Sequence, residues 1–364
     1  MKNKPTIGKK TAVVLFNLGG PDSLDSVKPF LFNLFNDKAI INLPQPFRFL
    51  LAKLISSRRA KKAQKIYAQI GGKSPLLEIT ATQAQALESE LSFFGDFKVF
   101  VAMRYWHPFC EETIERIGEY RPTQIILLPL YPQFSSSTSN SSIAEFLEKF
   151  PQIARRNIPI KTICCYPLEP DFINAHANLI KRTLAKLPEK KLGEFRLLFS
   201  AHGLPQKLID AGDPYVFHVT ASSNAVAERL AQIVNSKDKI DFQICYQSKV
   251  GPLKWTSPSL EHEIKRAALD KKIPLIVPIS FVSDHSETLV ELDIDYKNFA
   301  KELGIENYLR APALNLDGSF IKSLAEICKT AATKNEHEIF CGKNSDRICP
   351  KNFSYCPNPN PCCP

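Results

Sequence analysis

Residues 11–22 read Thr-Ala-Val-Val-Leu-Phe-Asn-Leu-Gly-Gly-Pro-Asp, an almost unbroken apolar run that ends in a glycine-rich turn. Such runs are typical of strands buried on both faces, as in parallel sheets covered by helices. Further runs of this kind follow at residues 97–103, 124–130, 160–165, 195–201, 240–245 and 274–281. Amphipathic stretches separate them, at residues 78–94, 109–119, 172–187, 220–234, 258–270 and 287–303. The alternation predicts an α/β fold in which parallel sheets are flanked by helices.

Length and composition indicate a folded chain of more than one domain. The 364 residues exceed the roughly 100–200 residues of a typical domain. A composition of 44% hydrophobic and 23% charged residues excludes a disordered chain. The predicted strands divide near residues 166–171, which gives two α/β halves. Beyond Lys334 prolines and cysteines become frequent, and we expect an irregular tail there.

Positive charge is concentrated in one stretch of the chain. The sequence has 47 Lys and Arg against 37 Asp and Glu, a net charge of +10 that favours an anionic partner. Residues 48–73 contain eight lysines and arginines and no acidic residue, with apolar side chains such as Phe47, Phe49 and Leu50 among or beside them. This pattern indicates a membrane-surface patch more than a nucleic-acid groove. The structural alternative is a solvated helix that covers the core.

Targeting signals are not evident in the sequence. No apolar run approaches the roughly 20 residues of a membrane-spanning helix. Residues 1–10 are polar and lack the apolar region of a signal peptide. We therefore expect a cytoplasmic protein, or one that is peripheral on the inner face of the membrane, whose ten cysteines are mostly reduced or metal-bound.

Two familiar motifs are excluded. Gly72-Lys73-Ser74 resembles the end of a phosphate-binding loop, but Tyr67 occupies the position of the first glycine. His262-Glu263 lacks the second histidine of a zinc peptidase motif.

One candidate site residue follows from its position. His202 comes directly after the predicted strand at residues 195–201, and ligands of doubly wound sheets bind beyond the carboxyl ends of the strands. A histidine there can act as a base or as a metal ligand. The alternative is a loop histidine that a backbone carbonyl satisfies.

An acidic row is the sharper signal. Asp284, Glu287, Glu291 and Asp295 are spaced by three, four and four residues, which places them on one stripe of a helix. Like charges at this spacing repel, so the row requires cations, a bound metal or shared protons. A capping box of Asp284 and Glu287 explains only the first two members. With His285 beside it, the row predicts a functional site.

Several motifs in order resemble the ferrochelatase family, over roughly residues 11–330. The matching stretches are Asn17-Leu-Gly-Gly-Pro-Asp, Ile70-Gly-Gly-Lys-Ser-Pro, Arg104-Tyr with His107-Pro, Leu130-Tyr-Pro-Gln-Phe-Ser, Leu198-Phe-Ser-Ala-His-Gly-Leu-Pro, Gly212-Asp-Pro-Tyr, Tyr246-Gln-Ser-Lys-Val-Gly-Pro, Trp255, and Ser283-Asp-His-Ser-Glu-Thr-Leu-Val-Glu-Leu-Asp-Ile. The resemblance implies two Rossmann-like domains, at residues 1–168 and 169–312, with a porphyrin cleft between them. It further implies a helix at residues 313–335 that packs back on the first domain, followed by a Cys/Pro-rich tail at residues 336–364.

The resemblance also implies the reaction and its residues. A ferrochelatase is a lyase-type metal chelatase of haem biosynthesis that inserts Fe²⁺ into protoporphyrin IX and releases two protons. His202 and Glu287 would be catalytic and metal-binding, and Asp284, His285 and Glu291 would line the route for metal or for departing protons. The chemistry requires a base that is poised near neutral pH, which suits a histidine.

Porphyrin-contact residues follow from the same resemblance. A flat apolar ring with carboxylate tails needs aromatic and aliphatic walls together with cations. The candidates are Leu18, Arg104, Tyr105, Tyr131, Tyr215, Trp255 and Phe281. Residues 42–56 align with the hydrophobic lip of the family, which gives the basic and apolar segment a membrane-contact role.

The tail cysteines suggest a second metal centre, because some family members carry a [2Fe–2S] cluster on tail cysteines. The predicted ligands are Cys349, Cys356, Cys362 and Cys363, with Cys341, Cys164 and Cys165 as further candidates. The tight spacing of the family tail is absent, and Ser136 occupies the internal cysteine position of the animal enzymes. Zinc binding, or no metal, fits nearly as well.

Alternative functions stay open at this point. Coproporphyrin III is the nearest alternative substrate, and cobalt insertion into a corrin precursor uses a related fold. A non-catalytic porphyrin or metal carrier would not need both His202 and the acidic row. We expect no nucleic-acid partner. The sequence leaves open whether the protein is a monomer or a homodimer.

Overall fold

The computed structural model describes residues 9–154, 158–236, 238–249, 251, 253–334, 339–343 and 346–360. The chain divides into two compact units. The first contains the described parts of Met1–Tyr166, Ile321–Pro350 and Pro357–Pro364. The second contains the described parts of Pro167–Phe320 and Lys351–Cys356. Each unit has one sheet.

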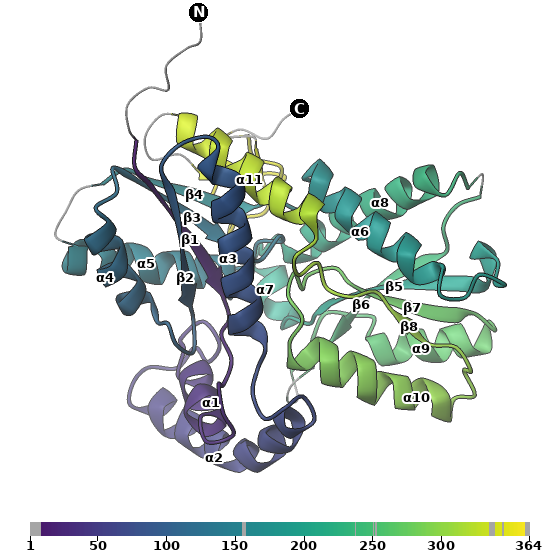
Figure 1. Ribbon diagram of the computed structural model, residues 1–364. Helices are drawn as coiled ribbons and strands as arrows, with labels where there is room; N and C mark the ends of the chain where they lie inside the picture. Colours follow the sequence, from purple (N-terminus) through teal and green to yellow (C-terminus); the bar gives the residue numbers. More distant parts are fainter. Residues whose placement is uncertain are drawn as a thin grey trace, which may run out of the picture. The chain divides into compact units, whose positions relative to one another are not determined.

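The first sheet is fully parallel, in the order β2-β1-β3-β4-β9. Figure 1 labels the first four of these strands. Its strands are β1 (Thr11–Asn17), β2 (Phe97–Met103), β3 (Gln124–Pro129), β4 (Ile160–Cys165) and β9 (Ile339–Cys341). Every residue of β1 is buried, as its continuous apolar sequence predicted.

The helices of this unit are α1 (Val27–Phe35), α2 (Phe47–Ala68), α3 (Leu76–Ser92), α4 (Cys110–Tyr120), α5 (Ser139–Ala154) and α11 (Gly318–Thr333). Helices α3, α4 and α5 pack on the strands, whereas α1 and α2 pack on each other. Alternate β1 residues Ala12, Val14 and Phe16 share one buried core with apolar residues of α4 and α5, such as Ile114 and Phe146. The period-2 alternation of a strand therefore defines which residues meet these two helices.

The tail departs from the expectation of an irregular segment. Ile339–Cys341 form β9, which pairs in parallel with the edge strand β4. The short apolar run Ile-Phe-Cys pairs with a strand that is distant in the sequence. No local sequence pattern therefore predicts this pairing.

The second sheet is also parallel, in the order β6-β5-β7-β8. Its strands are β5 (Phe195–His202), β6 (Phe242–Gln247), β7 (Ile273–Pro278) and β8 (Leu309–Arg310). The helical segments are α6 (Pro170–Leu184), η1 (Leu192–Glu194), α7 (Gln206–Asp210), α8 (Tyr215–Ile233), α9 (Leu260–Leu269), η2 (Glu287–Asp295) and α10 (Tyr296–Glu302). Two parallel sheets flanked by helices confirm the predicted α/β fold class.

Within the described residues, no helix combines the length and the apolar composition that crossing a bilayer requires.

Candidate functional site

The carboxyl edge of the second sheet gathers polar side chains from all four of its strands. His202 is the last residue of β5, Gln247 the last residue of β6, and Arg310 the last residue of β8. The segment after β7 leads into Glu287, the first residue of η2. Parallel strands bring their carboxyl ends to one edge, so residues far apart in sequence meet there.

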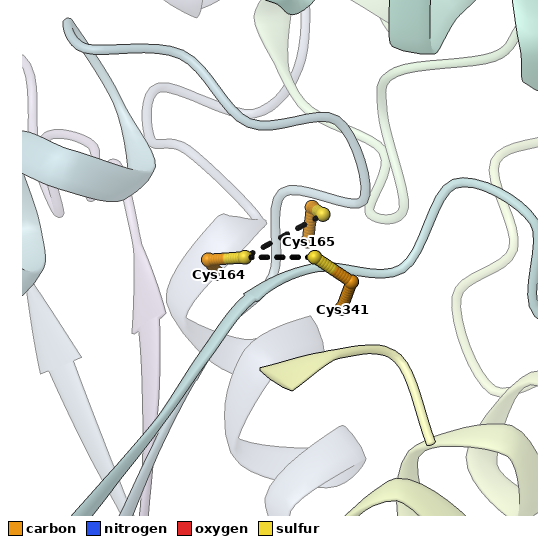
Figure 2. Close-up of side chains that lie close together, drawn as sticks. All are labelled: Cys164, Cys165 and Cys341. Atoms are coloured by element: carbon orange, nitrogen blue, oxygen red, sulfur yellow. Dashed lines mark hydrogen bonds between the residues drawn. The ribbon is translucent and has the colours of Figure 1, made fainter. Parts of the chain in front are cut away.

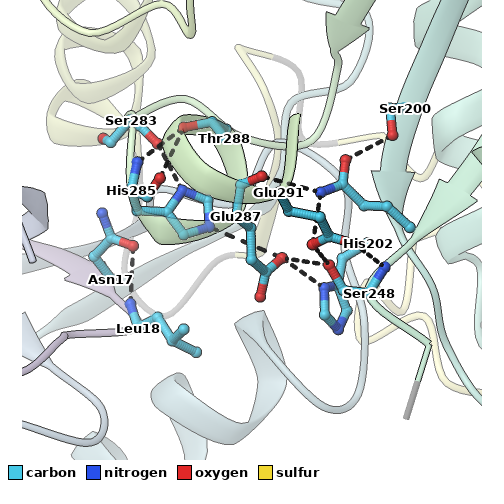
Figure 3. Close-up of polar contacts among 11 residues, drawn as sticks. Asn17, Leu18, Ser200, His202, Ser248, Ser283, His285, Glu287, Thr288 and Glu291 are labelled. Atoms are coloured by element: carbon cyan, nitrogen blue, oxygen red, sulfur yellow. Dashed lines mark hydrogen bonds and ion pairs between the residues drawn. The ribbon is translucent and has the colours of Figure 1, made fainter. Parts of the chain in front are cut away.

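His202 and Glu287 form the central pair (Figure 3). The Nδ1 atom of His202 lies 2.9 Å from Oε2 of Glu287, and their side chains are 37% and 28% exposed. Since the carboxylate can only accept, the neutral imidazole donates through Nδ1 and keeps its lone pair on Nε2. The sequence predicted both residues, and the structure brings them together.

The two members of the pair stabilise each other's charged form. Burial opposes the charge of His202, but the facing Glu287 carboxylate outweighs it and raises the pKa of the imidazole. Burial likewise opposes ionisation of Glu287, and the His202 imidazole outweighs it and lowers the pKa of that carboxyl group. The site therefore stabilises the imidazolium that forms when His202 accepts a proton on Nε2.

His285 and Phe281 complete the surroundings of this pair. Nδ1 of His285 lies 3.1 Å from the Ser283 carbonyl oxygen, so it carries the proton and leaves Nε2 as the basic nitrogen. That Nε2 atom lies 3.9 Å from Oε2 of Glu287. The Phe281 ring stands edge-on to His202, with centroids 6.5 Å apart, and lies 4.8 Å from the ring of His285. Phe281 thus gives both imidazoles an apolar neighbour.

The acidic row is not the α-helical stripe that its spacing predicted. Glu287–Asp295 form a π-helix, whose hydrogen bonds join residues five apart. Glu287 and Glu291 both face Ser248, whereas Asp295 is exposed. Burial and the neighbouring Glu287 raise the pKa of the Glu291 carboxyl group. Only two members of the predicted row therefore belong to one polar cluster with His202.

The predicted capping box is wrong, because Asp284 has a different partner. Its carboxylate accepts a hydrogen bond from Arg310 at 2.8 Å and another from the side-chain amide of Asn315 at 2.7 Å. Arg310 also binds Asp293 through two hydrogen bonds of 2.7 and 2.6 Å. The side chain of Asp284 is 12% exposed, and burial would raise its pKa, but Arg310 overcomes this and lowers it.

Arg310 is thus the cation that compensates Asp284, the first member of the acidic row. It ends the two-residue strand β8 and lies 26 positions after Asp284, so sequence spacing offered no signal for it. The same holds for Asn315, whose side chain both donates to Asp284 and accepts its backbone N–H.

Sequence reasoning also missed the partners of Glu291. Ser248 donates its backbone N–H to Oε1 at 3.0 Å, and Gln247 lies 3.3 Å from Oε2 through its side-chain amide. Both residues belong to the motif Tyr246-Gln-Ser-Lys, so the motif was a signal without an assigned role.

Trp255, another porphyrin candidate of the second unit, lies beside the chain segment that follows His202. The segment around Trp255 pairs antiparallel with Pro205. A Cβ atom on Gly203 would lie 3.3 Å from the Trp255 ring, so this ring packs over the residue after His202. Tyr215 begins α8, is only 6% exposed, and has a pKa raised by burial.

The first unit places Arg104 and Tyr105 in a hydrogen-bonded network. The Arg104 guanidinium lies 2.8 Å from Asp37, 2.7 Å from Glu145 and 2.9 Å from Ser141. The Tyr105 hydroxyl donates to Asp37 at 2.7 Å, and the residue is 3% exposed. Their polar atoms are engaged within the protein, which leaves them less available to a ligand.

Leu18 and Tyr131 are partly exposed and follow β1 and β3. Leu18 packs against the apolar core of α1 and α2. Their positions after parallel strands are those the sequence predicted.

Three cysteines of the first unit form a buried cluster (Figure 2). Cys164 and Cys165 end β4, and Cys341 ends β9. The Sγ atom of Cys164 lies 3.6 Å from that of Cys165 and 3.5 Å from that of Cys341. The strand register shifts between Ile163 and Cys165, and such a bulge redirects side chains that would otherwise alternate.

This cluster has the donor atoms of a thiolate metal centre. Thiolates bound to one tetrahedral metal at about 2.3 Å stand about 3.8 Å apart, close to the observed sulfur separations. Hydrogen bonds from Cys164 and Cys165 lower the pKa of the Cys341 thiol, whose sulfur also lies 3.4 Å from the Asn358 amide nitrogen. Three thiols fit part of the four-cysteine set of a [2Fe–2S] cluster.

The predicted tail ligands divide into two groups. Cys349 and Cys356 are buried, in the first and the second unit respectively. Cys362 and Cys363 lie outside the described residues.

Comparisons with known proteins agree with these features. The family description Ferrochelatase matches residues 10–332. A ferrochelatase of Rickettsia bellii (strain OSU 85-389) is 54% identical over 351 residues, which cover 96% of this chain and 95% of the relative. A ferrochelatase of Pelagibacter ubique (strain HTCC1062) is 46% identical over 355 residues, with 96% and 98% covered.

A solved structure supports the fold alone. SirB from Bacillus subtilis with Fe3+ matches with a TM-score of 0.52 at 13% identity, and the match covers 89% of this chain and 96% of that chain. The family match and the close relatives, over nearly the whole length, show that the chain belongs to the ferrochelatase family.

Proposed function

We propose that this ferrochelatase inserts Fe²⁺ into protoporphyrin IX, using His202 and Glu287 at the carboxyl edge of the second sheet. The observation that carries the assignment of residues is the 2.9 Å contact between the two side chains. This contact joins a base and a carboxylate that are both partly exposed, and the ring of Phe281 lies next to the base.

The chemistry explains why this pair is suitable. A free porphyrin carries two pyrrole N–H protons, and both must leave when the dication enters. Nε2 of neutral His202 can accept one of them, and Glu287 then stabilises the imidazolium that forms. Once the imidazolium has released this proton to solvent, Nε2 can accept the second.

Glu291 and His285 extend the polar surface from this pair, and we assign them to iron delivery or proton removal. Asp284 is held by Arg310 and Asn315, so its role in this proposal is to orient the loop that carries His285. Phe281, Trp255 and Tyr215 are the proposed porphyrin contacts of the second unit. Leu18, Arg104, Tyr105 and Tyr131 remain predicted contacts of the first.

Anaerobic metallation tests the central claim. Protoporphyrin IX and ferrous iron are supplied to the intact protein, to His202→Ala and to His262→Ala as the control, since His262 is exposed. We expect turnover that collapses in His202→Ala, with porphyrin binding retained, and that persists in His262→Ala. Porphyrin binding without turnover in the intact protein would favour a carrier.

The identity of the porphyrin is tested in competition. Equal amounts of protoporphyrin IX and coproporphyrin III are supplied with limiting iron, and the two haem products are separated. Predominant formation of protohaem supports the proposed substrate. Predominant formation of coprohaem would assign the protein to the alternative reaction.

A membrane-contact surface is proposed on α2. Its first turns expose Phe47, Leu50 and Leu54 at 64%, 61% and 46%, and exposed cations such as Arg58 and Lys62 follow. Apolar side chains that insert at the headgroup level and cations that attract anionic lipid form one peripheral binding surface.

Vesicle sedimentation tests this surface. Phe47→Ser with Leu50→Ser should reduce binding to vesicles of phosphatidylglycerol and phosphatidylcholine. The matched control is Leu269→Ser, because Leu269 is 82% exposed outside α2. Equal binding by all three proteins would exclude the surface.

We also propose that Cys164, Cys165 and Cys341 hold a [2Fe–2S] cluster, with a fourth thiolate from the predicted tail cysteines. The support is the buried set of sulfur atoms within 4.8 Å of one another. When bound, such a cluster supplies one-electron redox chemistry and a covalent link between β4 and the tail.

Metal and sulfide analysis tests the cluster without relying on turnover. The purified protein should contain iron and acid-labile sulfide and absorb visible light, and Cys341→Ala should lose both properties. Cys110→Ala is the control, because Cys110 is buried in a different core. Zinc without sulfide would identify a zinc site instead, and the absence of both would end the proposal.

A further inference from the structure

Ser248 is the first residue beyond β6 and contacts both glutamates of the site. Its hydroxyl oxygen lies 3.0 Å from Oε2 of Glu287 and 2.5 Å from Oε2 of Glu291. Its backbone N–H donates to Oε1 of Glu291 at 3.0 Å. Ser248 therefore binds Glu291 at two points and reaches Glu287 from the same atom (Figure 3).

The backbone of Ser248 is in an uncommon conformation. Its φ is +62°, in the left-handed region that side chains with a Cβ atom disfavour. Among the described non-glycine residues with positive φ, Arg121, Asn235 and Lys271 lie at the carboxyl ends of helices α4, α8 and α9, where this conformation is ordinary.

Ser248 and Asn315 are the remaining two described residues of this kind, and neither ends a helix. Both instead bind acids of the site: Asn315 binds Asp284, and Ser248 binds Glu287 and Glu291. Backbone strain of this type persists where the surrounding structure requires it, often at functional sites. The left-handed turn aims the N–H and hydroxyl groups of Ser248 at η2.

Gln247, the residue before this turn, is buried and held in place by a hydrogen bond. Gln247 is 1% exposed, and its Oε1 accepts a hydrogen bond of 2.6 Å from the Ser200 hydroxyl. Its amide nitrogen is therefore directed at Glu291, 3.3 Å away. The end of β6 thus presents three donors to the start of η2.

Glu287 consequently has two partners on one oxygen atom. His202 lies 2.9 Å and Ser248 3.0 Å from the same Oε2 atom. Two neighbouring carboxylates would otherwise move apart, because like charges repel. The two carboxylates share the single hydroxyl proton of Ser248, and this shared contact limits that movement and keeps Glu287 directed at His202.

We propose that Ser248 is a positioning residue for iron insertion, which holds Glu287 against His202 and Glu291 beside it. It acts through the two glutamates and does not touch the porphyrin in this role. The inference rests on the proposed function. Turnover by the wild-type protein distinguishes the two claims: its absence contradicts the proposed function, whereas wild-type turnover with unchanged Ser248 variants contradicts the positioning role.

Two variants test the hydroxyl group. Ser248→Ala removes it and keeps the strained backbone, whereas Ser248→Gly removes it and relaxes that strain. We expect kcat for ferrous iron insertion to fall about tenfold or more in both, the size of one hydrogen bond to a charged group. KM for protoporphyrin and Tm should stay close to wild type. Ser89→Ala, an exposed serine of α3, is the control.

A double variant identifies the path of the effect. If Ser248 acts by holding Glu287, Ser248→Ala added to Glu287→Gln should lower the residual kcat little beyond Glu287→Gln alone. Multiplying effects would overturn the inference, because Ser248 would then act elsewhere. Wild-type kcat in Ser248→Gly would overturn it as well, since the hydroxyl group would be dispensable.

Discussion

At the scale of single residues, burial and the presence or absence of a charged partner determine whether a side chain is charged. Arg310 brings one guanidinium to two carboxylates, Asp284 and Asp293. His176 is the opposite case: it is 1% exposed, its Nε2 atom has no hydrogen-bond partner among the described residues, and burial lowers its pKa to about 3. Loss of the Arg310 cation and protonation of the buried neutral His176 are therefore two separate ways to destabilise the folded protein.

His176 should make the protein sensitive to acid. Its pKa is lower in the folded than in the unfolded chain, so below pH 6.5 the unfolded state binds the extra proton. Stability is complete above that pH and is lost as the pH falls toward 3. At pH 5 the loss is about 2 kcal/mol.

The measurement is urea unfolding at pH 7.5 and pH 5. His176→Leu should be less sensitive to this change of pH than wild type, and the exposed His262→Gln should match wild type. An unchanged pH dependence in His176→Leu would mean that other groups cause the acid sensitivity.

Arg310→Leu should destabilise the second unit, because it leaves two carboxylates without their cation. We expect the free energy of unfolding to fall by about 2–4 kcal/mol, since Arg310 is 10% exposed. Arg182→Leu is the matched control: Arg182 is 64% exposed and pairs with Asp317, so its loss should cost less than about 1 kcal/mol. Equal effects in chemical denaturation would refute the distinction.

At the scale of elements, local irregularities bring the side chains of the two candidate sites together. The π-helix η2 brings Glu287 and Glu291 to Ser248, and the bulge in β4 brings Cys164 and Cys165 toward Cys341. A buried lysine side chain attaches helix α11 to the first sheet. Lys161 of β4 is 1% exposed, and its ammonium group donates to the carbonyl oxygens of Ala332 and Lys334 at the end of that helix.

Lys161→Met should loosen the carboxyl end of α11. The cation satisfies carbonyl groups that have no partner inside the helix and suits the helix dipole. We expect a loss of about 1–3 kcal/mol and faster hydrogen exchange at residues 326–334. Lys322→Met, on the exposed side of the same helix, should change neither. Equal exchange rates in both variants would mean that Lys161 does not hold the helix.

At the scale of the whole molecule, the chain visits its two units more than once. After β9 the tail contributes Lys351–Cys356 to the second unit. There the Ser354 hydroxyl donates to the Ala211 carbonyl at 2.9 Å, and Phe353 lies 5.3 Å from the ring of Phe217. Gly212 permits this contact, because a Cβ atom on it would lie 2.5 Å from the Ser354 oxygen.

Gly212→Ala should release this part of the tail. Gly212 has a φ of +98°, so the variant is also strained. Gly304→Ala separates the two causes, because Gly304 has a φ of +78° with open space around its Cβ position. Limited proteolysis should cleave the tail near residue 354 faster in Gly212→Ala only. Equal cleavage in both variants would attribute the effect to strain.

The sequence by itself determined the strand and helix alternation and the α/β class, and it predicted His202 and Glu287 as site residues. Each rests on local information: continuous apolar runs, helical periodicity, and a polar residue directly after a strand. The motif order also indicated the family, because it is written along the chain.

Only the tertiary structure decided which partners these residues have. Arg310, Ser248 and Asn315 meet the acidic row because parallel strands end at one edge, a relation without a fixed sequence separation. Cys341 meets Cys164 because a three-residue strand joins a sheet edge beside a bulge. Partners of this kind depend on strand order and register, and those are set by packing of the whole sheet and not by any local stretch.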